Sequence, residues 1–452
     1  MKKIFQKIVL FSVLAMVVSC SAKTKKQEPV TPQTALQSYL TNGDKTFNWE
    51  VKEKFKYDGL TAFDILLTSQ NWRDHIWTHQ LTIYVPDKIE YNGALLFITG
   101  GSINDGYPNW KKHDNKLAKL LVPVAKENQA LVAIVRQVPN QPLYNGLVED
   151  QLISFTFHNF QTDSDYTWPL LFPMVKSAVR AMDVVQDFAK KELTREVTGF
   201  TVSGASKRGW TTWLTGANDK RVEAIAPMVI DVLNMPVSLQ YQLDVWHNYS
   251  PQIKDYEKLG ILQTTETASG KALMKMVDPY SYREKLTMPK MIFMGTNDEY
   301  WPVDAVKNYI YNIPGENFIH YTPNAGHGLN GFGYAVSTLN AFWGRTLQKQ
   351  PYPKFTTDVA SDKSSVTITI TTSAGKLLNA YCWSANSVDR DFRDEQWSKT
   401  VVEKNGEEVQ YKIDFPKKGF KAFYIDLEFA NLTGGSYLKS TRMFVVDTTN
   451  VL

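Results

Sequence analysis

The stretch that decides the fold is Val202-Ser203-Gly204-Ala205-Ser206-Lys207-Arg208-Gly209-Trp210. It joins an apolar run that predicts a strand to a segment that predicts a helix. A serine at a tight turn from strand to helix forms a nucleophile elbow, which small residues must flank. Gly204 meets this need, whereas Arg208 takes the usual place of the second glycine and Gly209 follows it. The stretch therefore predicts a Ser206 hydroxyl at the carboxyl edge of a parallel sheet, where such sheets bind ligands.

The segments around this stretch predict an α/β core over residues 46–350. Strand-like runs occur at 63–68, 80–85, 94–99, 131–135, 197–202, 224–229 and 290–294, several of them continuously apolar as in parallel strands buried on both faces. Helical spacing occurs between them at 112–127, 174–191 and 206–215. Strands that alternate with helices in this way form a parallel sheet with helices on its faces.

Two later segments supply the partners that a nucleophilic serine needs. The strand at 290–294 leads into Gly295-Thr296-Asn297-Asp298, and Asn324-Ala325-Gly326-His327-Gly328 follows before a helical segment. Serine needs a base to become nucleophilic, and histidine needs a carboxylate that fixes its tautomer. Because Ser206, Asp298 and His327 stand in the chain order of α/β-hydrolases, we predict that fold with these residues as a catalytic triad.

The acid of this triad has an alternative, and so has the oxyanion site. Asp231 ends the preceding strand and is the second candidate acid, whereas Glu299 and Asp304 fit solvated loop residues. The Lys207 backbone amide is expected to be one oxyanion donor. The second donor is expected in the loop after the strand at 94–99, at Gly101 or its neighbours Gly100 and Ser102.

The other histidines predict no metal centre, and we expect no cofactor. His75 and His79 are four residues apart, but no glutamate lies beside His75, so the zinc-protease pattern is absent. The remaining histidines without ligand spacing are His113, His158, His247 and His320. Four tryptophans are candidates to line a pocket for sugars or aromatic groups, with core packing favoured for the third: Trp168, Trp210, Trp213 and Trp301.

Two further segments complete the predicted fold. Residues 232–288 form a long interval without an apolar strand and predict a helical cap over the carboxyl edge of the sheet, a place that often serves binding. After the linker-like 350–353, residues 365–371 alternate strictly between apolar and polar side chains, as a half-buried antiparallel strand does. We therefore expect an antiparallel β-sandwich over residues 354–452.

The N-terminal residues predict a lipoprotein leader. Three lysines precede an apolar run at 8–18, which suits a signal peptide and is too short to span a bilayer. The run ends at Val17-Val18-Ser19-Cys20, which resembles a bacterial lipobox. We expect residues 1–19 to be removed and Cys20 to be lipidated, with a flexible tether over 20–45. Ser21 favours the outer membrane if the envelope is Gram-negative.

The charge balance argues against a nucleic-acid partner. The 452 residues contain 50 Lys plus Arg and 46 Asp plus Glu, a net charge of +4. Residues 1–40 hold six of these lysines and one glutamate, so the rest of the chain has 44 basic and 45 acidic residues, a net charge of −1. Phosphate binding needs a basic face. The two cysteines form no disulfide framework, and Cys382 is expected to be a free thiol in a strand.

The chain resembles the PhoPQ-activated pathogenicity-related protein family over about residues 45 to 445. This resemblance implies an α/β-hydrolase-like core with a C-terminal β domain and a virulence association, and it implies little about the substrate. Trp246-His247-Asn248-Tyr249 departs from the glycine-containing segment expected there. The elbow also resembles that of glucuronoyl methylesterases, with Lys207 in place of their arginine, which implies that the side chain at 207 supports the oxyanion. The segments that carry the family resemblance are 138–142, 149–150, 172–174, 204–213, 229–234, 278–280 and 323–327.

We therefore expect a serine hydrolase anchored to a bacterial envelope, acting on a carboxylic ester of a small molecule, glycan or peptide. A serine peptidase with the same triad is one alternative. The other is a binding lipoprotein that uses a hydrolase scaffold without catalysis, because fold alone does not establish activity.

Overall fold

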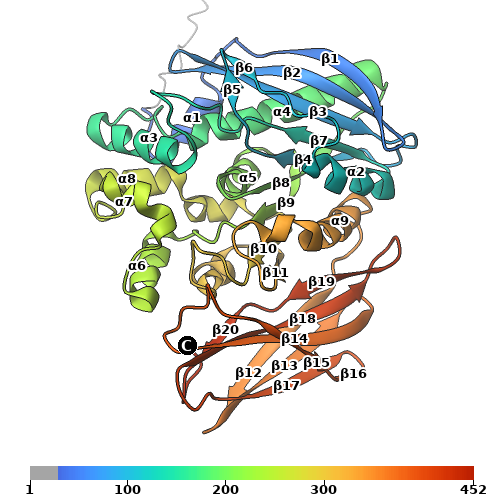
Figure 1. Ribbon diagram of the computed structural model, residues 1–452. Helices are drawn as coiled ribbons and strands as arrows, with labels where there is room; N and C mark the ends of the chain where they lie inside the picture. Colours follow the sequence, from blue (N-terminus) through green and yellow to red (C-terminus); the bar gives the residue numbers. More distant parts are fainter. Residues whose placement is uncertain (1–28) are drawn as a thin grey trace, which may run out of the picture.

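The computed structural model describes residues 29–452, so the predicted signal peptide and Cys20 lie outside the described residues (Figure 1). Within the described part, no helix has the length and apolar character that a membrane span requires. The largest sheet in the described part of the chain has 14 strands. Its strands in spatial order are β1 (Asn48–Tyr57), β2 (Leu60–Trp72), β3 (His75–Val85), β7 (Leu131–Val135), β4 (Gly93–Ile98), β8 (Gly199–Ala205), β9 (Val222–Met228), β10 (Lys290–Gly295), β11 (Asn317–Thr322), β19 (Ser436–Ser440), β18 (Phe420–Ala430), β14 (Leu377–Ser387) and β15 (Ser398–Val402), with β20 (Phe444–Val446) paired to β18.

The middle of this sheet, from β7 to β11, is parallel, whereas β1, β2 and β3 are antiparallel. Every residue of β7 and of β10 is buried, which accounts for their continuous apolar sequences. The elbow follows β8, and the predicted acid and histidine follow β10 and β11. This topology is the α/β-hydrolase fold, so the predicted fold class is confirmed.

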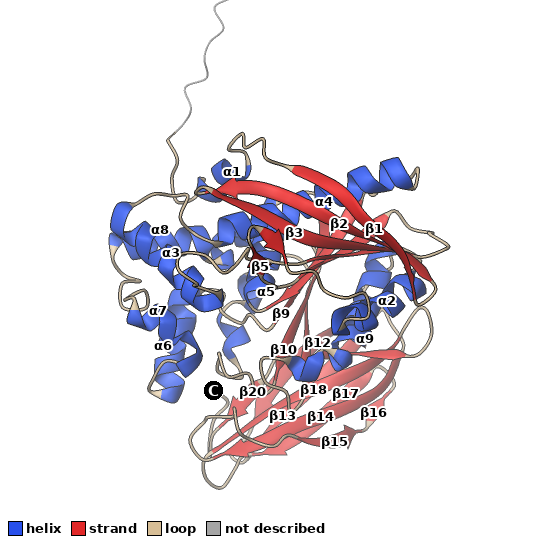
Figure 2. Cartoon of the chain, turned by 45° about the horizontal axis from the view of Figure 1, so that its top comes forward, coloured by secondary structure: helices blue, strands red, loops and turns tan. Residues whose placement is uncertain are grey.

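Helices cover both faces of the sheet (Figure 2). One apolar cluster joins one face to α1 (Ala35–Leu40), α4 (Leu171–Glu192) and α5 (Lys207–Asn218). A second cluster joins the opposite face to α2 (Lys116–Asn128) and α9 (Gly333–Leu347). The molecule therefore has three layers in this part, and the central strands are shielded from water on both sides.

The segment between β9 and β10 is helical, as the predicted cap requires (Figure 1). It contains α6 (Met235–Trp246), η1 (Pro251–Ile253), α7 (Lys254–Lys258), α8 (Ala268–Val277) and η2 (Pro279–Lys285). Helix α3 (Glu149–Asp163) packs against α7 and α8 and widens this layer. The short elements elsewhere are β5 (Ile103–Asn104), β6 (Tyr107–Pro108), η3 (Ala305–Asn308), η4 (Ile310–Asn312) and η5 (Leu329–Gly331).

The C-terminal strands form the predicted antiparallel sandwich, but one of its two sheets is not separate. The sheet of β12 (Lys354–Ser361), β13 (Ser365–Ser373), β17 (Glu408–Asp414) and β16 (Lys404–Asn405) packs on β14 and β18 through a shared apolar core. The opposing sheet continues the central sheet, because Ile319 of β11 pairs with Ser440 of β19. The two domains thus share one hydrogen-bonded sheet.

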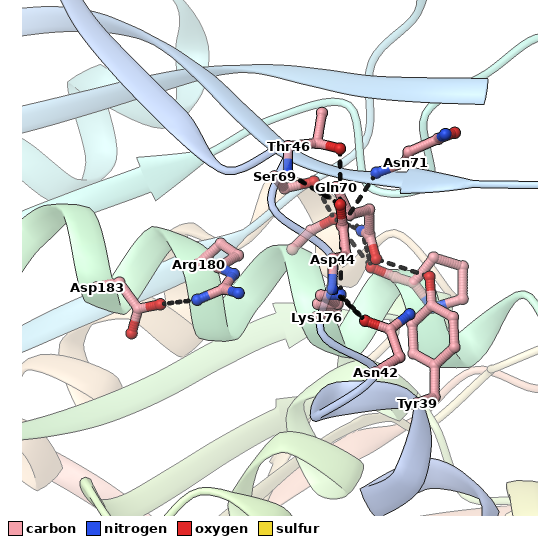
Figure 3. A network of polar contacts seen from close by, with 12 residues as sticks. Tyr39, Asn42, Asp44, Thr46, Ser69, Gln70, Asn71, Lys176, Arg180 and Asp183 are labelled. Atoms are coloured by element: carbon pink, nitrogen blue, oxygen red, sulfur yellow. Dashed lines mark hydrogen bonds and ion pairs between the residues drawn. The ribbon is translucent and has the colours of Figure 1, made fainter. Parts of the chain in front are cut away.

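The predicted flexible tether over 20–45 is wrong for its C-terminal part, which is folded. Helix α1 packs its apolar side into the core, and the Tyr39 hydroxyl donates a hydrogen bond to a buried glutamine of β2 (Figure 3). The ammonium of Lys176, which is 1% exposed, lies 2.8 Å from Asn42 Oδ1 and 3.3 Å from Asp44 Oδ2. A buried lysine needs such partners, so these residues belong to the domain.

Candidate active site

Ser206 lies at a sharp turn between β8 and α5. Its backbone angles of φ +59° and ψ −125° are strained for a residue with a side chain. Glycine is required on both sides, because a Cβ on Gly204 would lie 2.8 Å from the Arg208 carbonyl oxygen and one on Gly209 2.7 Å from that of Met228. The residue that passes close to the Met228 carbonyl is therefore Gly209, one position later than the usual second glycine. This explains why the elbow accommodates Arg208 at the position before it.

Three predicted residues come together at this turn. His327 Nε2 lies 2.8 Å from Ser206 Oγ. His327 Nδ1 lies 2.9 Å from Oδ2 and 3.1 Å from Oδ1 of Asp298. The imidazole is thus placed to accept the hydroxyl proton at one nitrogen while the carboxylate orients the other.

Asp231, the alternative acid, has a different environment. It is 4% exposed, and among the described residues its hydrogen-bond partners do not include His327. Burial raises the pKa of Asp231 to about 7, and the negative charges of Asp298 and Asp304 act in the same direction. A carboxyl group with this pKa is protonated in about half of the molecules at neutral pH, so the case rests on the geometry, which favours Asp298 as the partner of His327.

Glu299 is an exposed loop residue, as the sequence predicts, whereas Asp304 is buried and the prediction of a solvated residue is wrong for it. Glu299 Oε2 accepts a hydrogen bond of 2.9 Å from the His327 backbone N–H, which ties the acid loop to the histidine loop. Asp304 is 1% exposed and accepts from the Tyr241 hydroxyl at 2.7 Å. Tyr300 also meets the site, with its ring stacked on the imidazole at a centroid distance of 4.1 Å. These contacts depend on the tertiary fold, so no sequence pattern predicts them.

The two basic residues of the elbow are paired with two acidic residues at the start of α3. Lys207 Nζ lies 2.6 Å from Asp150 Oδ2. Arg208 makes two parallel hydrogen bonds to the Glu149 carboxylate, at 2.6 and 2.8 Å. Burial acts to raise the pKa of Glu149, but the Arg208 charge, the hydrogen bonds from Arg208 and Gln141 and the Lys207 charge together hold the pKa below its ordinary value. The Lys207 side chain is thus neutralised by a neighbour, and an oxyanion role for it remains a prediction.

The predicted backbone donors lie on two segments that border the elbow. Lys207 is the first residue of α5, so its N–H has no acceptor within the helix. Gly100 follows β4 and lies directly against the Arg208 guanidinium, and the Gly101 carbonyl accepts from the Gln141 amide at 3.3 Å. The assignment of Gly101 as the second donor remains a prediction.

The C-terminal domain contacts both loops that carry the triad partners. Its loop at residues 388–397, between β14 and β15, is called the bracing loop here. Asn297 precedes Asp298 and donates from Nδ2 to three carbonyl groups of the bracing loop, at 2.7, 3.2 and 3.2 Å. Asn324, in the histidine loop, donates to the Trp397 carbonyl at 3.0 Å and accepts from its N–H at 2.7 Å.

Replacement of Asn324 tests this bracing. Asn324→Ala removes both hydrogen bonds to Trp397 and frees the histidine loop, so we expect kcat for an activated ester to fall about 10- to 100-fold with KM within about twofold, as small misplacements do. Asn431→Ala is the matched control, because Asn431 joins the same domain to Glu127 of α2, away from the triad loops. Equal losses in both variants would contradict a positioning role.

The histidine pair four residues apart is structural. His79 is fully buried, with Nε2 2.9 Å from Ser69 Oγ and Nδ1 2.8 Å from the Arg136 carbonyl oxygen. Burial lowers the pKa of His79 to about 4, so the ring is neutral. His75 instead packs its ring against Tyr144. The two histidines therefore do not share a ligand.

His113, which the sequence left without partners, joins an ionic cluster outside this site. Its Nε2 lies 3.3 Å from Glu53 and 3.6 Å from the buried Asp64. Among the described residues, these three have the donor set and spacing of a metal site. The tryptophans divide as well: Trp210 and Trp301 line a cavity beside Ser206, whereas Trp213 is a core residue and Trp168 lies under Arg73.

Together, a serine on a strand-to-helix elbow and a histidine–aspartate pair after the last two parallel strands define an α/β-hydrolase-fold protein. The profile of the family described as PhoPQ-activated pathogenicity-related protein matches residues 36–393, and the chain belongs to this family. The predicted resemblance is thereby confirmed.

Comparisons with individual proteins give the following relatives. Autocrine proliferation repressor protein A from Dictyostelium discoideum is 31% identical over 381 residues, which cover 80% of this chain and 76% of that protein. Acetyl xylan esterase 1 from Thermoanaerobacterium sp. JW/SL YS485 is 17% identical with a TM-score of 0.49, over 70% of this chain and 94% of that one. Glucuronoyl esterase from Solibacter usitatus is 12% identical with a TM-score of 0.42, over 70% and 92%.

Proposed function

We propose that the protein is a serine hydrolase that cleaves carboxylic esters, with Ser206 as nucleophile, His327 as base and Asp298 as the orienting acid. The observation that carries this proposal is the continuous path from Ser206 Oγ through both imidazole nitrogens to the Asp298 carboxylate. A protein that only binds a ligand has no need for all three groups in this hydrogen-bonded arrangement. The strained elbow supports the same reading, since such strain concentrates at functional sites.

The chemistry follows from the geometry. Ser206 Oγ attacks the ester carbonyl carbon while His327 Nε2 takes its proton, and the imidazolium then gives this proton to the departing alcohol oxygen. The Lys207 N–H, at the N-terminus of α5, donates to the oxyanion. Water enters in place of the alcohol, is deprotonated by the same nitrogen and releases the acid. Asp298 holds the imidazole tautomer throughout.

A fluorophosphonate probe tests for an activated serine in the purified protein. We expect the probe to label Ser206 and the label to be found on the peptide that contains it. Folded protein that takes up no label would favour the binding alternative. A parallel screen of esters against the matching amides separates an esterase from a serine peptidase, because both use the same triad and differ in the leaving group.

We also propose that Cys20 anchors the protein to a bacterial envelope by its lipid. The lipobox-like Val17-Val18-Ser19-Cys20 supports this proposal. We expect the protein to sediment with membranes and Cys20→Ala to shift it to the soluble fraction, because anchoring by more than one acyl chain is stable. Membrane association of Cys20→Ala equal to that of the natural chain would contradict the anchor.

A further inference from the structure

An apolar cavity of about 50 Å³ lies beside Ser206 and His327, beneath the cap. Its apolar walls come from α3, α5, the cap and the neighbouring segments. The side chains that the argument uses are Phe157, Trp210, Met235, Leu239 and Met274. All five are less than 10% exposed. The cavity therefore begins at the reacting groups and continues into a water-poor space.

Most of the polar groups at the cavity already have partners within the protein. Asp150 pairs with Lys207 and accepts from the Tyr256 hydroxyl at 2.9 Å. Trp210 Nε1 donates to the Val277 carbonyl at 2.6 Å. Among the described tryptophans that line the cavity, Trp301 is the one whose Nε1 is buried without a hydrogen-bond partner. One donor does not match the several hydroxyl groups of a sugar, and an unpaired polar group would be costly to bury here.

We infer that this cavity binds the acyl group of the ester and that the acyl group is a short, apolar one. The inference rests on the proposed function and adds the substrate class to it. The cavity is small beside the roughly 150 Å³ that holds a benzene molecule, so it suits an acyl chain of a few carbon atoms. We therefore expect long fatty acyl chains and sugar acids to be poor substrates.

The acyl side of the ester is assigned because of the order of the bonds. After Ser206 Oγ forms its bond to the carbonyl carbon, the carbon–oxygen bond to the alcohol breaks and the alcohol carries away the proton from His327. The acyl group stays on Ser206 until water cleaves it and restores the hydroxyl. The group that stays is best held in the buried cavity, while the alcohol leaves past His327, whose side chain is 21% exposed.

The test compares p-nitrophenyl esters that differ in the acyl chain alone. We expect kcat/KM for the butyrate to exceed that for the acetate by about tenfold or more, since each methylene in an apolar pocket is worth roughly 10- to 200-fold. We expect the dodecanoate to fall below the butyrate. A flat profile, or a preference that follows the alcohol in butyrates of different alcohols, would overturn the inference.

Substitutions at Leu239 give effects of opposite sign. Leu239→Trp fills the cavity and is expected to reduce the butyrate-to-acetate ratio about tenfold, whereas Leu239→Ala enlarges it and is expected to move the optimum to a longer chain. Val237→Trp is the matched control, because Val237 lies on the same helix and is 47% exposed. Unchanged ratios in both Leu239 variants, with labelling by the fluorophosphonate intact, would overturn the acyl assignment alone. Loss of labelling in the folded natural chain would overturn the proposed function and the inference together.

Discussion

Ser206→Ala is expected to lower kcat/KM for an activated ester by about 10⁴- to 10⁶-fold and to abolish fluorophosphonate labelling. The substitution removes the only atom that forms the covalent bond, Oγ, which lies 2.8 Å from His327 Nε2. The members of a triad act as a unit, so the residual rate comes from the oxyanion donors and substrate binding. Steady-state kinetics with active-site titration measure this loss.

The control for this variant is a serine in β8, the strand that leads to the elbow. Ser203→Ala removes a hydroxyl that donates to the Ala226 carbonyl oxygen at 2.7 Å, in a residue that is fully buried and has no contact with His327 among the described residues. Its effect is expected on stability, at about 1 kcal/mol for a lost hydrogen bond. Ester hydrolysis that survives in Ser206→Ala would assign the activity to another group.

Asp298→Asn is expected to lower kcat about 10⁴-fold with little change in the fold. The amide keeps the size of the carboxylate but stabilises the wrong tautomer of His327 and offers no charge to the imidazolium. The natural pair has His327 Nδ1 at 2.9 Å from Asp298 Oδ2. Single-turnover kinetics measure the acylation rate directly and separate this step from product release.

Asp231→Asn is the matched control for the acid, since it makes the same chemical change in the alternative residue. Burial raises the pKa of Asp231 to about 7, so at neutral pH this substitution removes a charge that only about half of the molecules carry. We expect its kcat to stay within about tenfold of the natural value. A loss as large as that of Asp298→Asn would show that both carboxyl groups serve the histidine.

The features that the sequence predicts well are those held by local patterns. The elbow needs glycines close to Ser206 in the chain, and the acid and the histidine each follow a buried strand, so short segments contain the whole signal. The parallel strands are predictable for the same reason, because burial on both faces leaves continuous apolar runs. The strict alternation over 365–371 likewise predicts the antiparallel strands of the C-terminal domain.

The features that the sequence did not predict depend on residues far apart in the chain. Asn297 meets its partners in the bracing loop across more than 90 positions, and Glu299 reaches the His327 backbone only when two loops fold together. Helix α1 has six residues, too few for a periodic pattern, and its Tyr39 bonds to Gln70 of β2, while Asn42 just after the helix bonds to the buried Lys176. Such pairings belong to the tertiary structure, and a polar residue in a loop looks solvated until its partner is known.

The bracing loop limits where the chain can be cut and how its two domains can be recombined. A chain that ends at the linker near residue 350 would lack the partners of Asn297 and Asn324, and it would expose the edge of β11 that now pairs with β19. Exposed strand edges invite association with other chains. The family profile ends at residue 393, inside the bracing loop. The sandwich is therefore not a detachable module. Any recombination or fusion that keeps the site intact has to include the sandwich together with the hydrolase core.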